Sequence, residues 1–156
     1  MPKLSAGLLL YRRNGDDVQV LIAHPGGPIW SRRDAAAWSL PKGAPLDHET
    51  DLYDAARREF EEETGHRPPD GEAIDLGEVR MRSGKVVHGW AVEGNLDPAM
   101  LRSMLVEVEW PPKSGRLISV PEIDRVLWAD PAEAHRRLNP AQAAFVDRLL
   151  RALARS

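Results

Sequence analysis

Short apolar runs and longer mixed segments alternate along the chain, a pattern that predicts interleaved strands and helices. The runs 5–11 and 18–23 flank the dipeptide Asn14-Gly15, a strong turn signal, and together they predict a hairpin. Four later segments of the same apolar character complete the expected strands: 74–81, 86–92, 105–110 and 123–128. Because several of these strands are linked by short turns, the sheet is expected to be mixed.

Helix signals are clearest over residues 52–64. Asp51 stands where an N-cap is expected, and Gly65 stands where a helix commonly ends in the left-handed conformation. A third helix is expected to begin after Asn139, a second N-cap candidate. The two expected C-terminal helices cover 131–138 and 141–154. Strands alternating with helices predict an α/β sandwich.

Length and composition fit one globular domain spanning 1–156. The chain has 156 residues, of which 42% are hydrophobic and 29% charged, and no low-complexity linker divides it. The absence of cysteine excludes disulfides, thiolate nucleophiles and cysteine-ligated metal centres. The N-terminal apolar run Leu8–Leu10 is too short for a signal peptide or a membrane span, so a cytoplasmic protein without membrane association is expected.

Charge is unevenly distributed along the chain. The segment 47–63 contains eight acidic and two basic residues, giving −6, whereas the whole chain carries −3 and the remainder therefore +3. The nearly balanced total argues against broad nucleic-acid binding. A concentrated acidic segment within a mildly basic remainder instead suits a cation site beside an anionic ligand.

Three glutamates share one face of the acidic helix. Glu59, Glu62 and Glu63 are spaced i, i+3 and i+4, beside an apolar flank that is expected to pack on the sheet. Oxygen-only ligands favour Mg²⁺ or Mn²⁺ over zinc. Two other interpretations remain open: a solvated acidic face, or relief of the repulsion by an ion pair from Arg58 to Glu62. The apolar flank consists of Tyr53, Ala56 and Phe60.

The same segment closely resembles the Nudix box: Gly, five residues, Glu, seven residues, then Arg-Glu-U-x-Glu-Glu-x-Gly-U, with U aliphatic. The positions that match in type are Gly43, Glu49, Arg58, Glu59, Phe60, Glu62, Glu63 and Gly65. Similarity to bacterial Nudix proteins described as nucleoside-triphosphate pyrophosphohydrolases extends over nearly the whole chain. The resemblance implies the Nudix fold, an α/β/α sandwich around a mixed β-sheet.

Three departures from the family pattern stand out. Eight residues, rather than seven, separate Glu49 from Arg58, which lengthens the loop before the helix and puts the role of Glu49 in question. His48 replaces a common glycine, and His66 stands where an aliphatic residue is usual. None of the departures falls on the three glutamates of the metal-type face.

By resemblance, the chain is expected to be a Mg²⁺-dependent enzyme that hydrolyses a pyrophosphate bond in a nucleoside polyphosphate. Mn²⁺ is a possible substitute. Glu62 and Glu63 are expected to be metal ligands and Glu59 a ligand or a base, with backbone carbonyls near Gly43 completing the shell. Arg58 is expected to orient these groups. The expected substrates are nucleoside triphosphates or dinucleoside polyphosphates.

Further candidates lie outside the box. Glu122 is a candidate base or extra ligand, although a solvated glutamate at a strand end is an equal alternative. Trp90 is a candidate for stacking on a nucleobase. Each basic candidate for phosphate binding has solubilising surface charge as its alternative. These basic residues are Arg32, Arg33, Lys42, Lys85, Lys113 and Arg116.

Two functions from classes other than enzymes remain open. A non-catalytic nucleotide sensor on the same fold would bind without turnover, and an acidic helix used only as a partner surface would have no metal affinity. A Nudix enzyme acting on another nucleoside diphosphate derivative, such as an ADP-sugar, is a further possibility. The expected partner is a small nucleotide, and the chain is expected to be a monomer or a homodimer.

Overall fold

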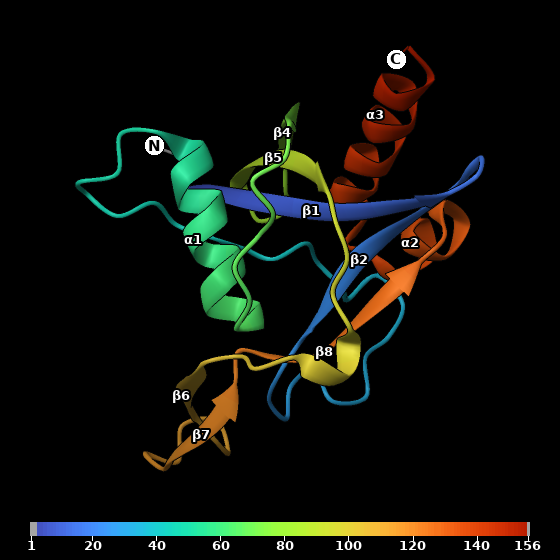
Figure 1. The fold of residues 1–156 in the computed structure, drawn as a ribbon. Helices are drawn as coiled ribbons and strands as arrows, with labels where there is room; N and C mark the ends of the chain where they lie inside the picture. The colour runs from blue at the N-terminus through green and yellow to red at the C-terminus, as the bar shows by residue number, and fades with distance from the viewer. Residues whose placement is uncertain (1–2, 156) are drawn as a thin grey trace.

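A mixed β-sheet forms the centre of the computed structural model, which describes residues 3–155 (Figure 1). Its strand order is β4-β5-β1-β2-β8, and the two-residue strand β3 pairs with β1 beside this path. Strands β1 and β5 are parallel, and the other neighbouring pairs are antiparallel. The strand bounds are β1 Leu4–Asn14, β2 Asp17–Pro25, β3 Lys42–Gly43, β4 Ala73–Arg80, β5 Val86–Glu93 and β8 Ile123–Ala129. The expected mixed sheet is confirmed.

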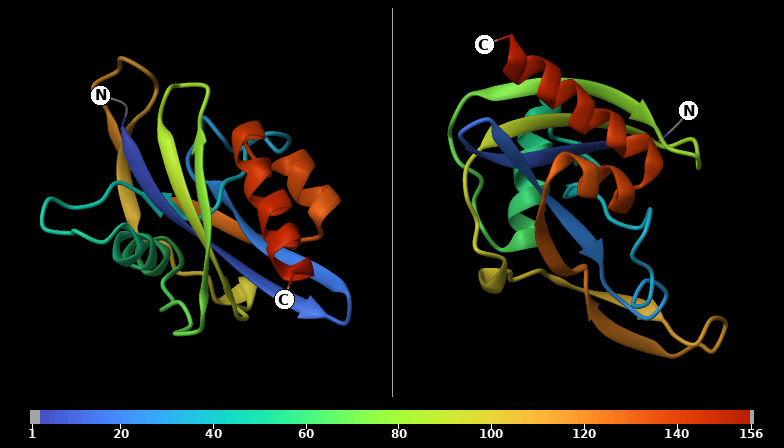
Figure 2. Two further views of the ribbon diagram at one scale, coloured as in Figure 1. Left: turned by 90° about the horizontal axis from the view of Figure 1, so that it is seen from above. Right: turned by 90° about the vertical axis from the view of Figure 1, so that its right-hand side faces the viewer.

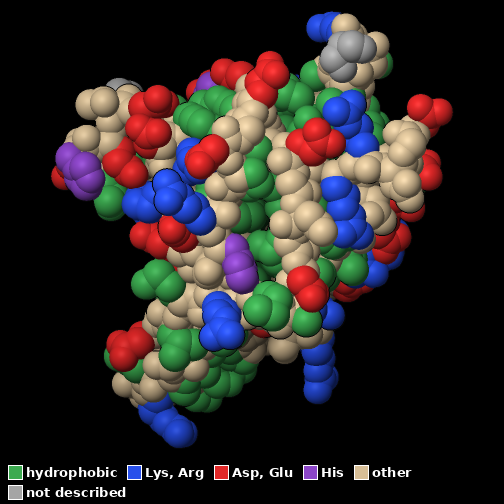
Figure 3. Space-filling view, in the orientation of Figure 1, with side chains coloured by type: hydrophobic (Ala, Val, Ile, Leu, Met, Phe, Trp, Pro, Cys, Tyr) green, Lys and Arg blue, Asp and Glu red, His purple; other side chains and the backbone are tan. Residues whose placement is uncertain are grey.

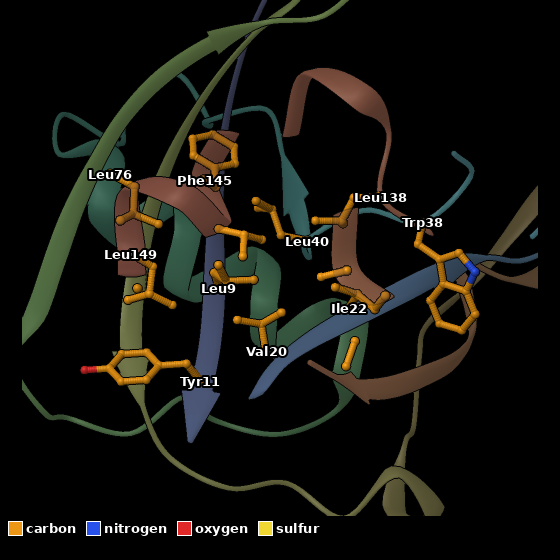
Figure 4. Packing of buried hydrophobic residues seen from close by; sticks show 14 of the residues in the cluster. Leu9, Tyr11, Val20, Ile22, Trp38, Leu40, Leu76, Leu138, Phe145 and Leu149 are labelled. Carbon is orange, nitrogen blue, oxygen red and sulfur yellow. The ribbon is translucent and has the colours of Figure 1, made fainter. Parts of the chain in front are cut away.

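Helices cover both faces of this sheet (Figure 2). Helix α1 (Leu52–Thr64) packs on one face, and α2 (Pro131–Arg137) and α3 (Ala143–Ala154) pack on the other. The alternation within β1 supplies both layers, because Leu8 lies in the cluster with α1 and Leu9 in the cluster with α3. Figure 4 shows the α3-side cluster. The expected α/β/α sandwich is therefore confirmed.

Both ends of α1 fall where the sequence places them. The Asp51 carboxylate accepts a hydrogen bond from the Tyr53 N–H at 2.9 Å, and Gly65 ends the helix with φ of 78°. A Cβ on Gly65 would also lie 2.5 Å from the Arg102 carbonyl oxygen. Both the turn and the close chain crossing therefore require glycine at this position.

A two-stranded ribbon projects away from the main sheet, and the sequence predicted only one of its two strands. Strand β6 (Leu105–Glu109) agrees with the sequence prediction, but its partner β7 (Leu117–Pro121) was not predicted. Hydrophobic side chains gather over this ribbon in the space-filling view (Figure 3). Its base lies beside the end of α1, because the Met104 N–H donates to the Glu62 carbonyl at 3.3 Å.

The C-terminal helical region begins differently from the prediction. Asn139 caps a short 3-10 turn, η2 (Pro140–Gln142), rather than α3 itself, and its side chain accepts from the Ala141 N–H at 3.2 Å. A second such turn, η1 (Pro98–Met100), follows β5. No helix within residues 3–155 has the length and apolar character needed to cross a bilayer.

Candidate active site

The three glutamates of the acidic face lie on the C-terminal half of α1, close to β3 and to the residues just before β8. Glu59 and Glu63 are buried, with 9% and 7% of their surface exposed, whereas the Glu62 side chain is 40% exposed. Glu63 and Glu122 border a cleft of ≈ 280 Å³. The cleft is lined by Ala23, Pro25, Ser39, Leu40, Lys42, Gly43, Glu63, Lys85, Glu122 and Ile123.

Gly43 provides the space in which the Glu59 carboxylate lies. A Cβ at position 43 would stand 2.1 Å from the Glu59 carboxyl carbon and 2.2 Å from its Oε2 atom. No side chain could occupy that space without displacing the carboxylate. The Gly43 backbone and the Glu59 carboxylate are therefore in direct contact, as a shared oxygen-ligand site would require.

Burial and mutual repulsion disfavour ionisation of the carboxylates around the cleft. Burial, together with the nearby Glu122 and Glu59, raises the pKa of Glu63 to about 8. Burial also raises the pKa of Glu59, although Arg58 opposes this effect. The pKa of Glu122 is raised by burial and by Glu62. A divalent cation would offset this cost, so the donor set fits Mg²⁺ or Mn²⁺.

Beside these acids, two lysines add positive charge to the cleft. Burial and the charge of Lys85 lower the pKa of Lys42, while Glu63, Glu59 and Glu122 oppose the shift. Both lysines line the cleft that the carboxylates border. The cleft thus combines oxygen ligands for a cation with ammonium groups that can bind an anion.

Arg58 connects the helix to the loop that precedes it. Its Nη1 donates to Glu59 and to Glu62, each at 3.0 Å, and its Nε and Nη2 donate to both Glu49 carboxylate oxygens at 2.9 and 3.0 Å. These bonds, with a further one from the Leu46 N–H, lower the pKa of Glu49 to about 2. The Arg58–Glu62 ion pair considered from the sequence is thus present, and Glu49 reaches Arg58 despite the extra residue.

The acidic groups are close together but are not arranged as ligands around one point. In the part of the chain that the structure describes, no three aspartate, glutamate or histidine side chains form a group that could hold an ion as they stand. Arg58 occupies oxygens of Glu59 and Glu62. Metal binding by all three glutamates would therefore require these ion pairs to open.

The remaining basic candidates lie outside the cleft. Arg32 and Arg33 are exposed in the loop after β2, and Lys113 and Arg116 are exposed at the tip of the β6–β7 ribbon. The tip is ordered by Glu109, whose carboxylate accepts from the Lys113 N–H at 2.9 Å. Among the basic candidates, the structure therefore brings only Lys42 and Lys85 to the carboxylates.

Trp90 lies on the Tyr53 side of α1, away from Glu62. Its ring is stacked on His88, with centroids 4.1 Å apart, and contacts Tyr53 at 5.6 Å. Tyr53 and Glu62 are nine residues apart, which places them on opposite sides of a helix of about 3.6 residues per turn. Trp90 is not among the residues that line the cleft, and its stacking on a nucleobase stays a prediction.

Apolar and small residues that no sequence motif marks also shape the cleft. Ala23 and Pro25 at the end of β2, Ser39 and Leu40 before β3, and Ile123 of β8 line it. The signal available was the cluster of glycine and proline around these strand ends, which marks sites where backbones approach closely.

Taken together, the fold and the cleft define an α/β/α sandwich protein with an acidic helix that faces two lysines. A family model described as NUDIX domain matches residues 1–149. The chain therefore belongs to the Nudix family, whose members are mostly hydrolases that bind nucleotides and typically use divalent metals. No curated protein matches the chain in sequence.

Solved structures agree with this fold across nearly the whole chain. The NUDIX domain of Shewanella oneidensis NrtR complexed with ADP ribose has a TM-score of 0.66 at 16% identity, covering 98% of this chain and 89% of that chain. A C. elegans Ap4A hydrolase binary complex has a TM-score of 0.66 at 19% identity, covering 97% and 99%. RenU, a Nudix hydrolase from M. smegmatis, has a TM-score of 0.55 at 24% identity, covering 98% and 86%. At these identities the similarity shows the fold alone.

Proposed function

We propose that this protein hydrolyses a pyrophosphate bond in a nucleoside polyphosphate, with Mg²⁺ as cofactor and Mn²⁺ as a possible substitute. The observation that carries the proposal is the burial of two neighbouring carboxylates, Glu59 against Gly43 and Glu63 at a cleft lined by two lysines. Uncompensated buried carboxylates are costly, and a divalent cation offsets that cost while attracting a phosphate group.

Each box residue has a distinct role in this proposal. Glu59, Glu62 and Glu63, together with a backbone carbonyl near Gly43, would hold the cation. When bound, the cation neutralises phosphate oxygens and lowers the pKa of the attacking water. Arg58 positions Glu59 and Glu62 through its ion pairs and is itself held by Glu49.

Glu122 lies between β7 and β8 and lines the same cleft as Glu63. Its pKa is raised, first by burial, and a carboxyl group that holds its proton more tightly suits a role in proton exchange. We assign it the role of general base or additional ligand. Its backbone is fixed on both sides, because its N–H donates to the Met104 carbonyl at 2.9 Å and its carbonyl accepts from the Gly26 N–H at 3.0 Å.

Lysine chemistry within the cleft favours a long anionic substrate. Lys42 and Lys85 would contact phosphate oxygens next to the bond that is cleaved. Phosphates farther from the cleaved bond would be bound by the exposed residues Arg32, Lys113 and Arg116. Trp90 would stack on a nucleobase of the substrate. Nucleoside triphosphates and dinucleoside polyphosphates supply several such phosphates, whereas an ADP-sugar supplies two.

The decisive experiment is a substrate panel of nucleoside triphosphates, dinucleoside polyphosphates and ADP-sugars with Mg²⁺ in ¹⁸O-water. Product masses identify the substrate and the phosphorus that is attacked. Glu62→Gln and Glu63→Gln should each lower turnover by orders of magnitude while the fold survives. Glu61→Gln, which alters an exposed carboxylate on the same helix, is the matched control. Wild-type rates in both site variants would refute the metal assignment.

A nucleotide sensor without catalysis is the second candidate. The Arg58 ion pairs that occupy Glu59 and Glu62 favour it, because they satisfy these acids without metal. The similar NrtR domain is a structure complexed with ADP ribose. Calorimetry with ADP ribose and the panel nucleotides separates the two: a sensor binds a nucleotide tightly with Mg²⁺ present but releases no product.

A further inference from the structure

His24 is a fully buried histidine at the end of β2, behind the wall of the cleft. Its side chain is 0% exposed, its Nε2 lies 2.6 Å from the Arg33 carbonyl oxygen, and its Nδ1 lies 2.8 Å from Asp124 Oδ1. Its ring also meets Trp38 edge-on at 5.1 Å. His24 does not line the cleft, and the proposed chemistry does not use it.

The two partners of His24 determine where its protons lie. A backbone carbonyl can only accept, so Nε2 carries a hydrogen and donates it to Arg33. The other partner is a carboxylate, and a bare Nδ1 facing it would place two lone pairs 2.8 Å apart. A hydrogen on Nδ1 or on the Asp124 carboxyl group must therefore lie between the two atoms, which makes the 2.8 Å contact a hydrogen bond.

The two hydrogen bonds of His24 join three segments near Glu122. The bond to Asp124 connects the end of β2 to β8, where the strand register shifts between His24 and Pro25, and the bond to the Arg33 carbonyl fixes the loop after β2. Gly26, the first residue of that loop, donates its N–H to the Glu122 carbonyl at 3.0 Å. A Cβ on Gly26 would lie 1.9 Å from the Pro121 carbonyl oxygen, so the two backbones are in close contact.

We propose that His24 is a positioning residue that holds Glu122 at the cleft through its buried hydrogen bonds to Asp124 and to the Arg33 carbonyl. The inference rests on the proposed function of the cleft. Without the bridge, the pairing of β2 with β8 loses its buried side-chain support beside Glu122, and the Glu122 carboxylate moves relative to the carboxylates of α1. Turnover then falls while substrate affinity, set by the lysines across the cleft, is retained.

The test compares His24→Phe, Asp124→Ala and Asp124→Asn with the wild-type protein. His24→Phe and Asp124→Ala should lower kcat by roughly 10- to 100-fold, as displacements of about 1 Å do, with KM nearly unchanged. Asp124→Asn should restore most of the rate, because its amide N–H can donate to a neutral Nδ1. The matched control is His135→Phe, which removes a 2.8 Å histidine–aspartate pair on the exposed side of α2 and should leave kcat unchanged.

Readouts other than activity separate this proposal from the proposed function. NMR of ring-labelled protein should show a hydrogen at His24 Nε2 and a hydrogen-bonded proton between Nδ1 and Asp124. Hydrogen exchange at the Gly26 amide should be faster in Asp124→Ala than in wild type. Unchanged exchange, or wild-type kcat in Asp124→Ala, would overturn the positioning role. A wild-type protein that turns over no panel substrate refutes the proposed function, and the exchange measurement still decides the role of His24.

Discussion

Replacing Glu63 by Gln should make the metal-free protein more stable, by an amount that increases with pH. The pKa of Glu63 is about 8 in the folded protein against an ordinary value of 4.5, with burial as the first cause. The folded state therefore binds the proton more tightly than the unfolded chain. The resulting stabilisation is fully present below pH 4.5 and is lost as the pH rises to about 8.

The size of the effect follows from this shift. At 1.36 kcal/mol per pKa unit, complete ionisation of Glu63 costs the folded state about 5 kcal/mol, of which roughly 3 kcal/mol applies at pH 7. Glutamine keeps the shape and accepts the Lys42 N–H but carries no charge, so it avoids the cost. The stability difference between variant and wild type should grow by about 4 kcal/mol from pH 5 to pH 9.

Urea unfolding in EDTA at pH 5, 7 and 9 measures this difference, with Glu61→Gln as the exposed control on the same helix. Adding Mg²⁺ at pH 8 should stabilise the wild type more than Glu63→Gln, because the cation binds the ionised carboxylate. A stability difference that stays constant across the three pH values would refute the account of Glu63 as a buried, reluctantly ionised group.

Three further predictions concern the surroundings of the site. Gly43→Ala should weaken Mg²⁺ binding by at least about tenfold through displacement of Glu59, as measured by calorimetry, whereas Gly71→Ala, with only an ordinary contact at 3.9 Å, should not. Glu49→Gln should destabilise the protein above pH 4.5, with the difference disappearing as the pH falls towards 2, because the lowered pKa of Glu49 reflects a bond that only the carboxylate makes. Trp90→Leu should raise KM if the ring stacks on a nucleobase; an unchanged KM across the panel would exclude that role.

Local signals in the sequence predicted the helices and most of the strands well. Residues 52–64 form the expected helix because Asp51 and Gly65 terminate it by local hydrogen bonding and backbone conformation. The cap at Asn139 was placed correctly, but the residues after it form a 3-10 turn before α3 begins. Local signals locate a helix end more reliably than they distinguish a 3-10 turn from the first α-helical turn.

Local sequence signals do not predict features that depend on contacts between distant parts of the chain. Strand β7 was missed because it pairs only with β6 and packs outside both core clusters, so its apolar residues follow no core-facing pattern. The parallel pairing of β1 with β5 also has no local signature. Glu122 and Glu63 meet at the cleft only in the folded protein. The sequence therefore identified both acids but favoured neither a site role nor a solvated position for Glu122.

The extra residue between Glu49 and Arg58 shows how the site tolerates a change in spacing. Only Thr50 and Asp51 separate Glu49 from the start of α1, and a turn from the Glu49 N–H to the Leu46 carbonyl at 2.9 Å orients the carboxylate. Arg58 then meets both Glu49 oxygens with two separate nitrogens, a geometry that fixes direction as well as distance. In the proposed function, the loop places the Glu49 carboxylate against Arg58, and Arg58 in turn positions Glu59 and Glu62. An insertion inside the helix would instead rotate Glu62 and Glu63 by about 100° relative to Arg58 and separate these groups.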